Sequence, residues 1–305
     1  MTNDPDRALF VGETCYDLTT LTDHWPALNE KFTSRRQAFC PGGGAVNAAF
    51  CCAELGLPPD LLTTVGLDDL GLQFASRAGR AGIQLHHRDV QTTPISVVRP
   101  DEGNRSLLRG PPQEYLRPFP ELDPGKFSWL HLDGKQPDAA MFYARAFRER
   151  GGIMTSLDTN PRDNTDDLLE FVDVPMASEK YFLGKNCSVD ELFAFFRRKG
   201  CKVGGVTFGE KGVYWYEGMS VTKHTRAFIV PKEKLLDTSG AGDGFNGALV
   251  FSRMQWPERP WESHIEFASA VGALMVQQFG NEQFPKLANV TALLESRPAI
   301  VRDVA

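Results

Sequence analysis

Apolar and polar positions along the 305-residue chain follow two alternating periods. Short apolar runs typical of buried strands lie at 8–11, 61–65, 129–132, 153–157, 174–177, 203–207 and 213–216. Apolar residues at spacings of three and four predict helices at 46–53, 69–78, 139–148, 189–198, 245–254 and 262–278. Because strands that alternate with helices usually form a parallel sheet, the pattern predicts an α/β fold with a mainly parallel central sheet and helices on both faces.

Two segments depart from this alternation. The polar stretch after the first strand looks inserted, and residues 95–98 and 106–108 flank a glycine-containing turn, which predicts a hairpin. We expect segments of about 13–40 and 92–110 to form a small β lid on a single domain, residues 1–305. The apolar strand at 95–98 would expose a hydrophobic face, so we also expect a homodimer that forms through the lid.

Composition narrows the class of protein. An apolar content of 42% supports a sizeable core, and a net charge of −6 argues against a nucleic-acid partner. Six cysteines without C-x-x-C spacing indicate reduced thiols, and neither a secretory signal nor a run of membrane-spanning length is evident, so we expect a cytoplasmic protein with no membrane partner. His86-His87 is interpreted as a surface pair at the end of a helix rather than as metal ligands.

The segment Asp-Thr-Ser-Gly-Ala-Gly-Asp at 237–243 carries the strongest chemical signal. Gly240, Ala241 and Gly242 leave backbone N–H groups unshielded at the start of a predicted helix, a position that attracts phosphate. Asp243 is suited to take a proton from a hydroxyl group while those amides stabilise a transferring phosphoryl group. The alternative, that Asp243 only favours the helix dipole, leaves the Gly-Ala-Gly run unexplained.

Other polar segments follow predicted strands, where ligands of parallel sheets gather. They are Gly42-Gly43-Gly44, the segment 158–162 (Asp-Thr-Asn-Pro-Arg) and the segment 207–212 (Thr-Phe-Gly-Glu-Lys-Gly). The last of these fits a nucleotide contact and a simple turn between strands equally well. Arg105 fits a lid residue over a phosphate, although a solvated hairpin arginine is the commoner case. No P-loop or G-x-G-x-x-G motif is present.

The segments 42–47 and 237–243 resemble the paired signatures of ribokinase-like carbohydrate kinases, the pfkB family, and the resemblance spans nearly the whole chain. Within that family, Trp25-Pro26, the segment 103–106 and the segment 131–134 resemble ketohexokinases and fructokinases most. The resemblance implies a ribokinase-like three-layer sandwich with a small β lid, and an enzyme that uses ATP and Mg²⁺. Use of a monovalent cation is left open.

The resemblance also implies roles for individual residues. Catalysis would use Asp243 with the amides of Gly240, Ala241 and Gly242. Sugar binding would use Asp17, Asn29, Gly43, Gly44, Asn47 and Asp243, with Asn29 placed where ketohexokinases reach across from a partner's lid. Nucleotide binding would use Arg105, Thr207, Gly209, Gly212, Gly240 and Gly242. Gly44 stands where ketohexokinases have Asn, Gly244 where Thr or Ala is usual, and no metal ligand is assigned because the segment 178–181 replaces the family's Asn-x-x-Glu.

The activity that the resemblance implies is transfer of the γ-phosphoryl group of ATP to a hydroxyl group of a small sugar, first of all a ketohexose such as fructose. The same chemistry on sulfofructose, ribose, a 2-keto-3-deoxy acid or a nucleoside stays open, because acceptor choice depends on pocket shape. A catalytically silent sugar or nucleotide sensor is a further alternative. The presence of Asp243 argues against it, since a pure binder needs no base.

Overall fold

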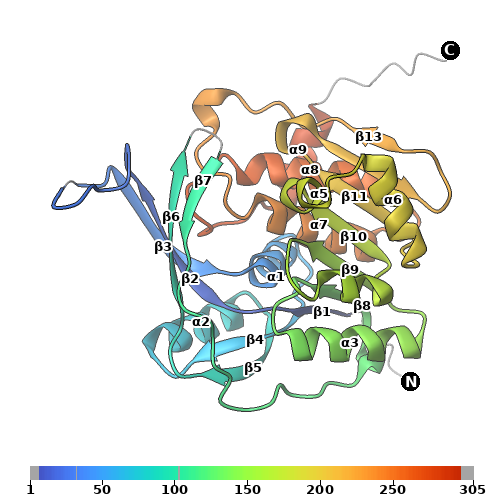
Figure 1. Cartoon of the computed structure of the whole chain (residues 1–305), viewed down its shortest axis with the longest axis horizontal. Coiled ribbons are helices and arrows are strands. Elements are labelled where there is room, and N and C mark those ends of the chain that lie inside the picture. Colours follow the sequence, from blue (N-terminus) through green and yellow to red (C-terminus); the bar gives the residue numbers. More distant parts are fainter. Residues whose placement is uncertain (1–6, 32, 102–103, 297–305) are drawn as a thin grey trace.

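The computed structural model describes residues 7–31, 33–101 and 104–296, and its main element is a nine-stranded sheet (Figure 1). The strand order is β13-β12-β11-β10-β9-β8-β1-β4-β5. The strands are β1 (Arg7–Val11), β4 (Asp60–Gly66), β5 (Gln84–Val90), β8 (Phe127–Leu132), β9 (Met154–Thr159), β10 (Val174–Ser178), β11 (Val203–Thr207), β12 (Val213–Glu217) and β13 (Lys223–Thr225). All neighbouring strands from β11 to β5 pair in parallel. β12 pairs antiparallel with both of its neighbours, β11 and β13. The predicted α/β fold with a mainly parallel sheet is confirmed.

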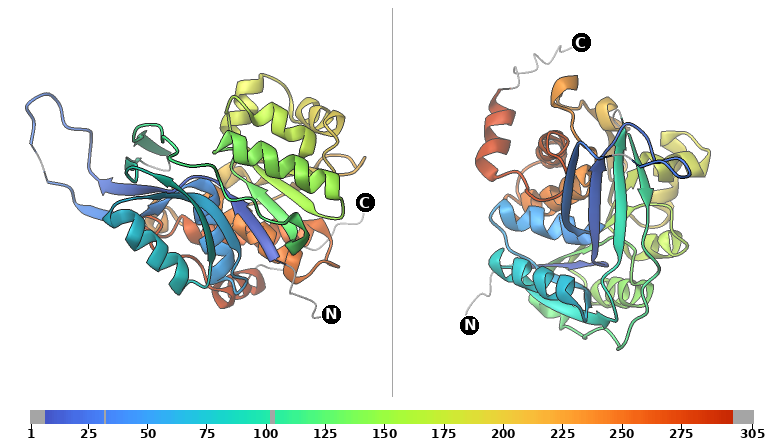
Figure 2. Two further views of the ribbon diagram at one scale, coloured as in Figure 1. Left: turned by 90° about the horizontal axis from the view of Figure 1, so that it is seen from below. Right: turned by 90° about the vertical axis from the view of Figure 1, so that its left-hand side faces the viewer.

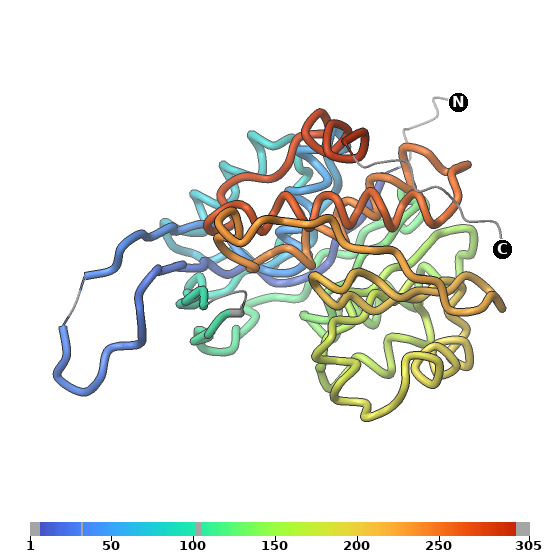
Figure 3. The backbone as a smooth tube through the Cα atoms, turned by 90° about the horizontal axis from the view of Figure 1, so that it is seen from above, coloured from blue at the N-terminus to red at the C-terminus, as the bar shows by residue number. Residues whose placement is uncertain are grey.

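Helices cover both faces of this sheet because side chains of its strands alternate between two cores. In β1, Phe10 packs into one core while Leu9 and Val11 pack into the other. The Phe10 side is covered by α1 (Gly44–Glu54), α2 (Asp69–Arg80), α7 (Ala241–Gln255), α8 (Trp261–Met275) and α9 (Leu287–Glu295). The other side is covered by α3 (Pro137–Arg150), α4 (Thr165–Leu168), α5 (Glu179–Lys185) and α6 (Val189–Arg198). Figure 3 shows the two helical layers above and below the sheet.

A second, four-stranded sheet stands beside the large one. Its order is β3-β2-β6-β7, with β2 (Cys15–Leu21), β3 (Arg36–Gly42), β6 (Ile95–Asp101) and β7 (Asn104–Leu108). The chain between β2 and β3 extends far from the body of the molecule (Figure 2). We call this element the small sheet.

The base of the small sheet is attached to α2 by one carboxylate. Asp68 caps α2, since its Oδ1 accepts a hydrogen bond from the Gly71 amide at 2.9 Å. The same carboxylate accepts the Thr93 amide at 2.6 Å and the Thr93 hydroxyl at 2.7 Å. Thr93 lies two residues before β6, so the first turn of α2 and the entry to the small sheet are held together.

The sequence-based placement of His86-His87 at the end of a helix was wrong. Both residues lie in β5, a strand that was not predicted, and His86 Nε2 contacts Asp60 Oδ1 at 2.6 Å. β5 is the outermost strand of the large sheet, where solvent-facing polar residues hide the apolar pattern of a strand. The short elements β13, α4 and α5 and the helix α9 were also not predicted. Within the described part of the chain, no helix is both long and apolar enough to cross a membrane.

Candidate active site

The first turn of α7 forms an open anion cradle. Gly240 is the residue before the helix and has a left-handed backbone with φ 73°, and a Cβ there would lie 2.3 Å from Asn281 Oδ1. Position 242 is different, because no atom lies within 4 Å of where a Cβ would stand. The free amides of this first turn therefore face space that a phosphate could fill.

A buried aspartate holds the loop before α7 in place. Asp237 Oδ1 accepts the Ser239 amide at 2.8 Å, and its Oδ2 accepts the Gly280 amide at 3.2 Å. These two bonds join the loop to the chain that follows α8. Behind α7, a Cβ on Gly244 would lie 2.9 Å from Met275 Cγ, so close packing on α8 favours glycine there.

Asp243 brings the two glycine-rich segments together. Its Oδ2 accepts a hydrogen bond from Asn47 Nδ2 at 2.8 Å, and Asn47 lies in α1 directly after the cluster 42–44. Burial, followed by the nearby Asp158 carboxylate, raises the pKa of Asp243 to about 7, against the opposing effects of Asn47 and Arg105. A carboxyl group that titrates near neutral pH is suited to accept a proton from an alcohol.

Two more carboxylates flank Gly44. Asp158 is the next-to-last residue of β9, and burial raises its pKa, with a further contribution from Asp133 and an opposing one from Arg162. Asp133 follows β8 and accepts the Ala45 amide at 3.1 Å. A Cβ on Gly44 would stand 3.1 Å from Asp133 Cβ and 3.4 Å from Asp158 Oδ2. This crowding gives a physical reason for glycine where ketohexokinases carry Asn.

A pocket of about 120 Å³ opens between these groups. It is lined by Arg105, Asp158, Asn160, Met176, Ser178, Thr207, Gly240, Gly242, Asp243, Phe245 and Asn246. The lining comes from the carboxyl ends of β9, β10 and β11, from α7 and from the small sheet. Arg105 Nη1 donates to the Thr238 carbonyl at 3.1 Å, so the small sheet contacts the loop before α7 directly.

The structure brings some of the sugar-side candidates together at the first glycine cluster and leaves Asn29 apart from them. A Cβ on Gly42 would lie 2.2 Å from Asp17 Oδ2, so this carboxylate lies against the first glycine cluster, and burial raises its pKa. Gly43 has φ 118°, and a Cβ there would lie 2.1 Å from the Glu13 carbonyl oxygen. Asn29 is exposed in the segment between β2 and β3, which extends away from the body of the molecule (Figure 2), and it is not among the residues that line the pocket.

Of the nucleotide-side candidates, some line the pocket and others do not. Thr207 lines the pocket with Asp243, whereas Gly209 and Gly212 lie beyond it in the turn after β11. Gly212 has φ 88° and packs closely under the Thr225 carbonyl, which a turn between strands already explains.

The sequence analysis placed the segment 158–162, and with it Asn160, at the ligand-binding end of the sheet without a specific role, and it assigned no role to Ser178 and Asn246. Asn160 and Ser178 end or follow neighbouring parallel strands, and this position was the available signal. Asn246 carries no comparable signal, because its position in α7 looks like one more helical residue.

The oxygen-rich lining suits a nucleotide with a hard cation. Asp158, Asn160 and Ser178 present side-chain oxygens of the kind that Mg²⁺ prefers. Across 7–31, 33–101 and 104–296, however, no group of three or more His, Cys, Asp or Glu side chains could hold a metal ion. These residues would therefore fit a Mg²⁺ ion held mainly by phosphate oxygens and water.

A helix start open to phosphate beside a carboxyl group that titrates near pH 7 is an arrangement typical of phosphoryl-transfer enzymes. The model of the pfkB family carbohydrate kinases matches residues 6–286, and the chain belongs to this family. Members of the family are phosphotransferases, so the chain is a carbohydrate kinase. The resemblance predicted from the two signatures is confirmed.

Individual relatives are distant but cover most of the chain. The chain is 27% identical to ribokinase of Lactococcus lactis, covering 93% of this chain and 96% of the relative. It is 26% identical to ATP-dependent ribose-1-phosphate kinase of Halopiger xanaduensis (95% and 99%) and 25% identical to ketohexokinase of Mus musculus (81% and 88%). The structure of Arabidopsis thaliana ribokinase complexed with ribose and ATP superposes with a TM-score of 0.80 at 21% identity, covering 96% and 100% of the two chains.

Proposed function

We propose that this protein transfers the γ-phosphoryl group of ATP to a hydroxyl group of a small sugar, with Asp243 as the general base. The position of Asp243 carries the proposal, because it lies at the open first turn of α7 and is oriented by Asn47 at 2.8 Å. Asp243 removes the proton of the sugar hydroxyl as that oxygen bonds to the γ-phosphorus. The bond between the γ-phosphorus and the bridging oxygen breaks, and ADP leaves with the electron pair.

The amides of Gly240, Ala241 and Gly242 stabilise the charge on the transferring group. The nucleotide is bound by Gly240 and Gly242 together with Arg105, Thr207, Gly209 and Gly212. On the sugar side, Asp17, Gly43, Gly44 and Asn47 hold hydroxyl groups, with carboxylate and amide groups that form directional hydrogen bonds. Mg²⁺ on the triphosphate would neutralise its charge and orient the γ-phosphoryl group.

Ser239 Oγ and Asn281 Oδ1 favour an additional monovalent cation. Both oxygens are buried beside Gly240 and lack a partner among the described residues. A cation held there would stiffen the loop before α7.

A ketohexose such as fructose is the first acceptor that we propose. Its support is the ketohexokinase-like segment 131–134, whose Asp133 lies against Gly44 in the site. Ribose is the second candidate, and the ribokinases among the relatives favour it.

An acceptor panel assayed by ADP release tests both candidates. Fructose, ribose, sulfofructose, a 2-keto-3-deoxy acid and a nucleoside are compared in the wild type and in Asp243→Asn, which exposes any contaminating kinase. We expect saturable, Asp243-dependent turnover with fructose. Turnover with ribose alone would transfer the proposal to the second candidate, and a silent panel would favour a sugar or nucleotide sensor.

We further propose a homodimer through the small sheet. The register aligns Phe39, Leu18, Val97 and Leu108 in one apolar row across all four strands. Phe39 is 42% and Leu108 64% exposed, and a second copy would cover both. In such a dimer Asn29, which does not line the pocket of its own chain, would approach the partner's pocket. Light scattering should give twice the chain mass for the wild type and the chain mass for Leu108→Glu; a wild-type monomer at micromolar concentration would refute the dimer.

A further inference from the structure

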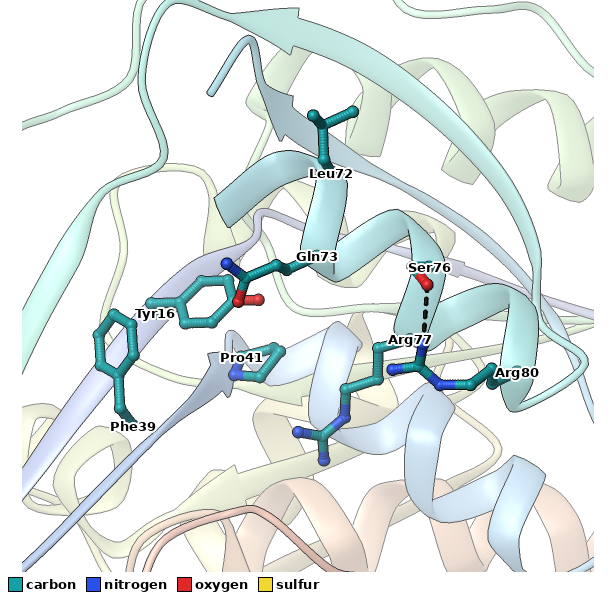
Figure 4. Close-up of a pocket in the computed structure, with 8 residues that line it drawn as sticks. All are labelled: Tyr16, Phe39, Pro41, Leu72, Gln73, Ser76, Arg77 and Arg80. Atoms are coloured by element: carbon teal, nitrogen blue, oxygen red, sulfur yellow. Dashed lines mark hydrogen bonds between the residues drawn. The ribbon is translucent and has the colours of Figure 1, made fainter. Parts of the chain in front are cut away.

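Successive residues at the start of β2 point to opposite faces of the small sheet. Tyr16 lies beside Phe39 and opposite α2 (Figure 4), on the face that the proposed dimer would cover. Asp17, the next residue, points to the other face, where it lies against Gly42. The chain that connects β1 to β2 therefore borders the proposed sugar side of the active site, and it carries one ionisable side chain without an assigned role, Glu13.

The backbone and the side chain of Glu13 contact different parts of this region. Its carbonyl oxygen fills the space beside Gly43, where a Cβ would lie 2.1 Å away. Both oxygens of its carboxylate have a partner, since Oε1 accepts a hydrogen bond from the Tyr115 hydroxyl at 2.6 Å and Oε2 lies 3.5 Å from Lys135 Nζ. The Glu13 side chain is only 16% exposed, so its charge acts on Lys135 with little screening by water.

Lys135 joins Glu13 to the residues around the first glycine cluster. It lies in the turn after β8, where its amide donates to Asp133 Oδ1 at 2.8 Å. The other oxygen of that carboxylate accepts the Ala45 amide at the start of α1, at 3.1 Å. Asp133 is fully buried and fixes the backbone of Lys135 beside α1. The Lys135 side chain reaches from there to the chain between β1 and β2.

Two cations act on the sugar side of the site, and each already has a partner. Burial raises the pKa of Asp17, against the opposing effects of Cys15, Arg105 and Lys135. Arg105 donates to the Thr238 carbonyl and is assigned to the nucleotide, while Lys135 is paired with Glu13. Neither cation is left to bind an anionic group on the acceptor, which the Asp17 carboxylate would repel.

We propose that Glu13 is a specificity-determining residue that restricts the acceptor to uncharged sugars, because it keeps Lys135 from binding an anionic group. This inference rests on the proposed sugar kinase function and names the class of its substrate. It favours fructose and ribose, which are neutral, over sulfofructose or a 2-keto-3-deoxy acid. Without the charge of Glu13, Lys135 would stand beside the sugar side as a ligand for phosphate, sulfonate or carboxylate.

Glu13→Gln tests this role, because the amide keeps the shape of the side chain and can still accept the Tyr115 hydroxyl. Fructose 1-phosphate and fructose 6-phosphate are the anionic acceptors, since they carry the phosphate at opposite ends, and fructose is the neutral reference. The readout is the ratio of kcat/KM for each phosphate to kcat/KM for fructose, measured by ADP release. At least one ratio should rise about tenfold or more, as Lys135 gains a charge-assisted contact. Unchanged ratios, or a wild type that already prefers a phosphate, would overturn the proposal.

Three further variants separate this effect from a general change in charge. Glu114→Gln removes the same charge at an exposed neighbouring position and should keep the wild-type ratios. Glu13→Gln combined with Lys135→Gln should lose the gain, because the cation is gone. Lys135→Gln alone leaves the charge of Glu13 unpaired and should lower the ratios at least about twofold. A rise in Glu114→Gln, or a rise that persists without Lys135, would refute the role of Glu13.

Binding measurements separate this inference from the proposed function. Titration calorimetry with each fructose phosphate uses the full chain with a non-hydrolysable ATP analogue and Mg²⁺ at saturation, so that the phosphate subsites of the nucleotide are filled. Glu13→Gln should bind at least one of the two about tenfold more tightly than the wild type does. If no acceptor is phosphorylated but this difference in affinity is present, the proposed function fails and the role of Glu13 stands. Equal or absent binding in both proteins would refute that role even if fructose is phosphorylated.

Discussion

The two glycine-rich segments of the site look alike in sequence, yet the structure uses them in opposite ways. At Gly43 and Gly44, protein atoms already occupy the space where a side chain would go, namely the Glu13 carbonyl, Asp133 and Asp158. At Gly242, that space is empty out to 4 Å. The first cluster therefore holds glycine because the folded chain is crowded there. In the second, Gly240 is also crowded, by Asn281 Oδ1, whereas position 242 keeps room for a ligand.

Because of this difference, we expect substitutions in the two clusters to affect different properties of the protein, its stability in one case and ligand binding in the other. A substitution in the first cluster should disturb folding and the position of Asn47, whereas a substitution in the open part of the second should leave the fold intact and affect only ligand binding. Asp243 joins the two through its bond to Asn47. Substitutions in each segment can break or sharpen this contrast.

The largest effect is expected from Asp243→Asn, which keeps the shape of the side chain and removes the base. We expect kcat to fall by about 10³-fold or more, within the range usual for loss of a general base. Fluorescence titration with ATP should show little change in nucleotide affinity. A variant with wild-type kcat would remove Asp243 from the chemistry.

The pH profile should show the same group. Because burial and Asp158 raise the pKa of Asp243 to about 7, the base is protonated in acid, and kcat/KM should fall as pH drops through about 7. At pH 5 the activity should be roughly one hundredth of its value on the plateau above pH 8. A profile that stays flat from pH 8 to pH 5 would contradict the assignment.

Gly43→Ala should affect stability most. The left-handed backbone and the contact of 2.1 Å with the Glu13 carbonyl predict a loss of about 2–4 kcal/mol in the free energy of unfolding, measured by urea denaturation. Gly79→Ala in α2 is the matched control, since no atom lies within 4 Å of its Cβ position, and it should be neutral or slightly stabilising. Equal stability of the two variants would break the contrast.

Gly242→Ala should do the reverse. Its free energy of unfolding should stay within about 1 kcal/mol of the wild type, because alanine is a better helix former and nothing opposes its methyl group. The kcat/KM for ATP should fall about tenfold, because the methyl group enters the space left for phosphate and shields the amides. Steady-state kinetics beside urea denaturation separates the two effects.

The smallest effect concerns the stability of Asp243→Asn. A raised pKa means that folded Asp243 holds its proton between pH 3.8 and about 7 while the unfolded chain has released it, so the charged form costs stability above that window. The variant should therefore melt at a higher temperature than the wild type at pH 8 and equally at pH 4. Asp163→Asn, at an exposed position, serves as control.

The fold was predicted well where residues form a strong pattern. The buried parallel strands and the long helices gave clear periods, whereas β5 did not, because its edge position places exposed polar residues such as Gln84 and His87 within a strand. Glycine signals located both halves of the site. The contact between Asn47 and Asp243, 196 positions apart, follows only from the packing of α1 on α7, and no local pattern contains it.

The sequence predicted the site less completely than the fold, because contacts between residues distant in the chain leave no local pattern. The carboxylates Asp133 and Asp158 end neighbouring strands, but their crowding around Gly44 depends on the pitch and register of the sheet.

The attachment of the small sheet to α2 rests on Asp68, which caps the helix and also accepts a hydrogen bond from the Thr93 amide at the entry to β6. A chimera that imports the four-stranded sheet of a relative while keeping the native start of α2 would separate the two halves of this joint. An exchange of the small sheet between relatives should therefore include residues 66–71, because Asp68 in this segment forms the hydrogen bonds that hold the small sheet to α2.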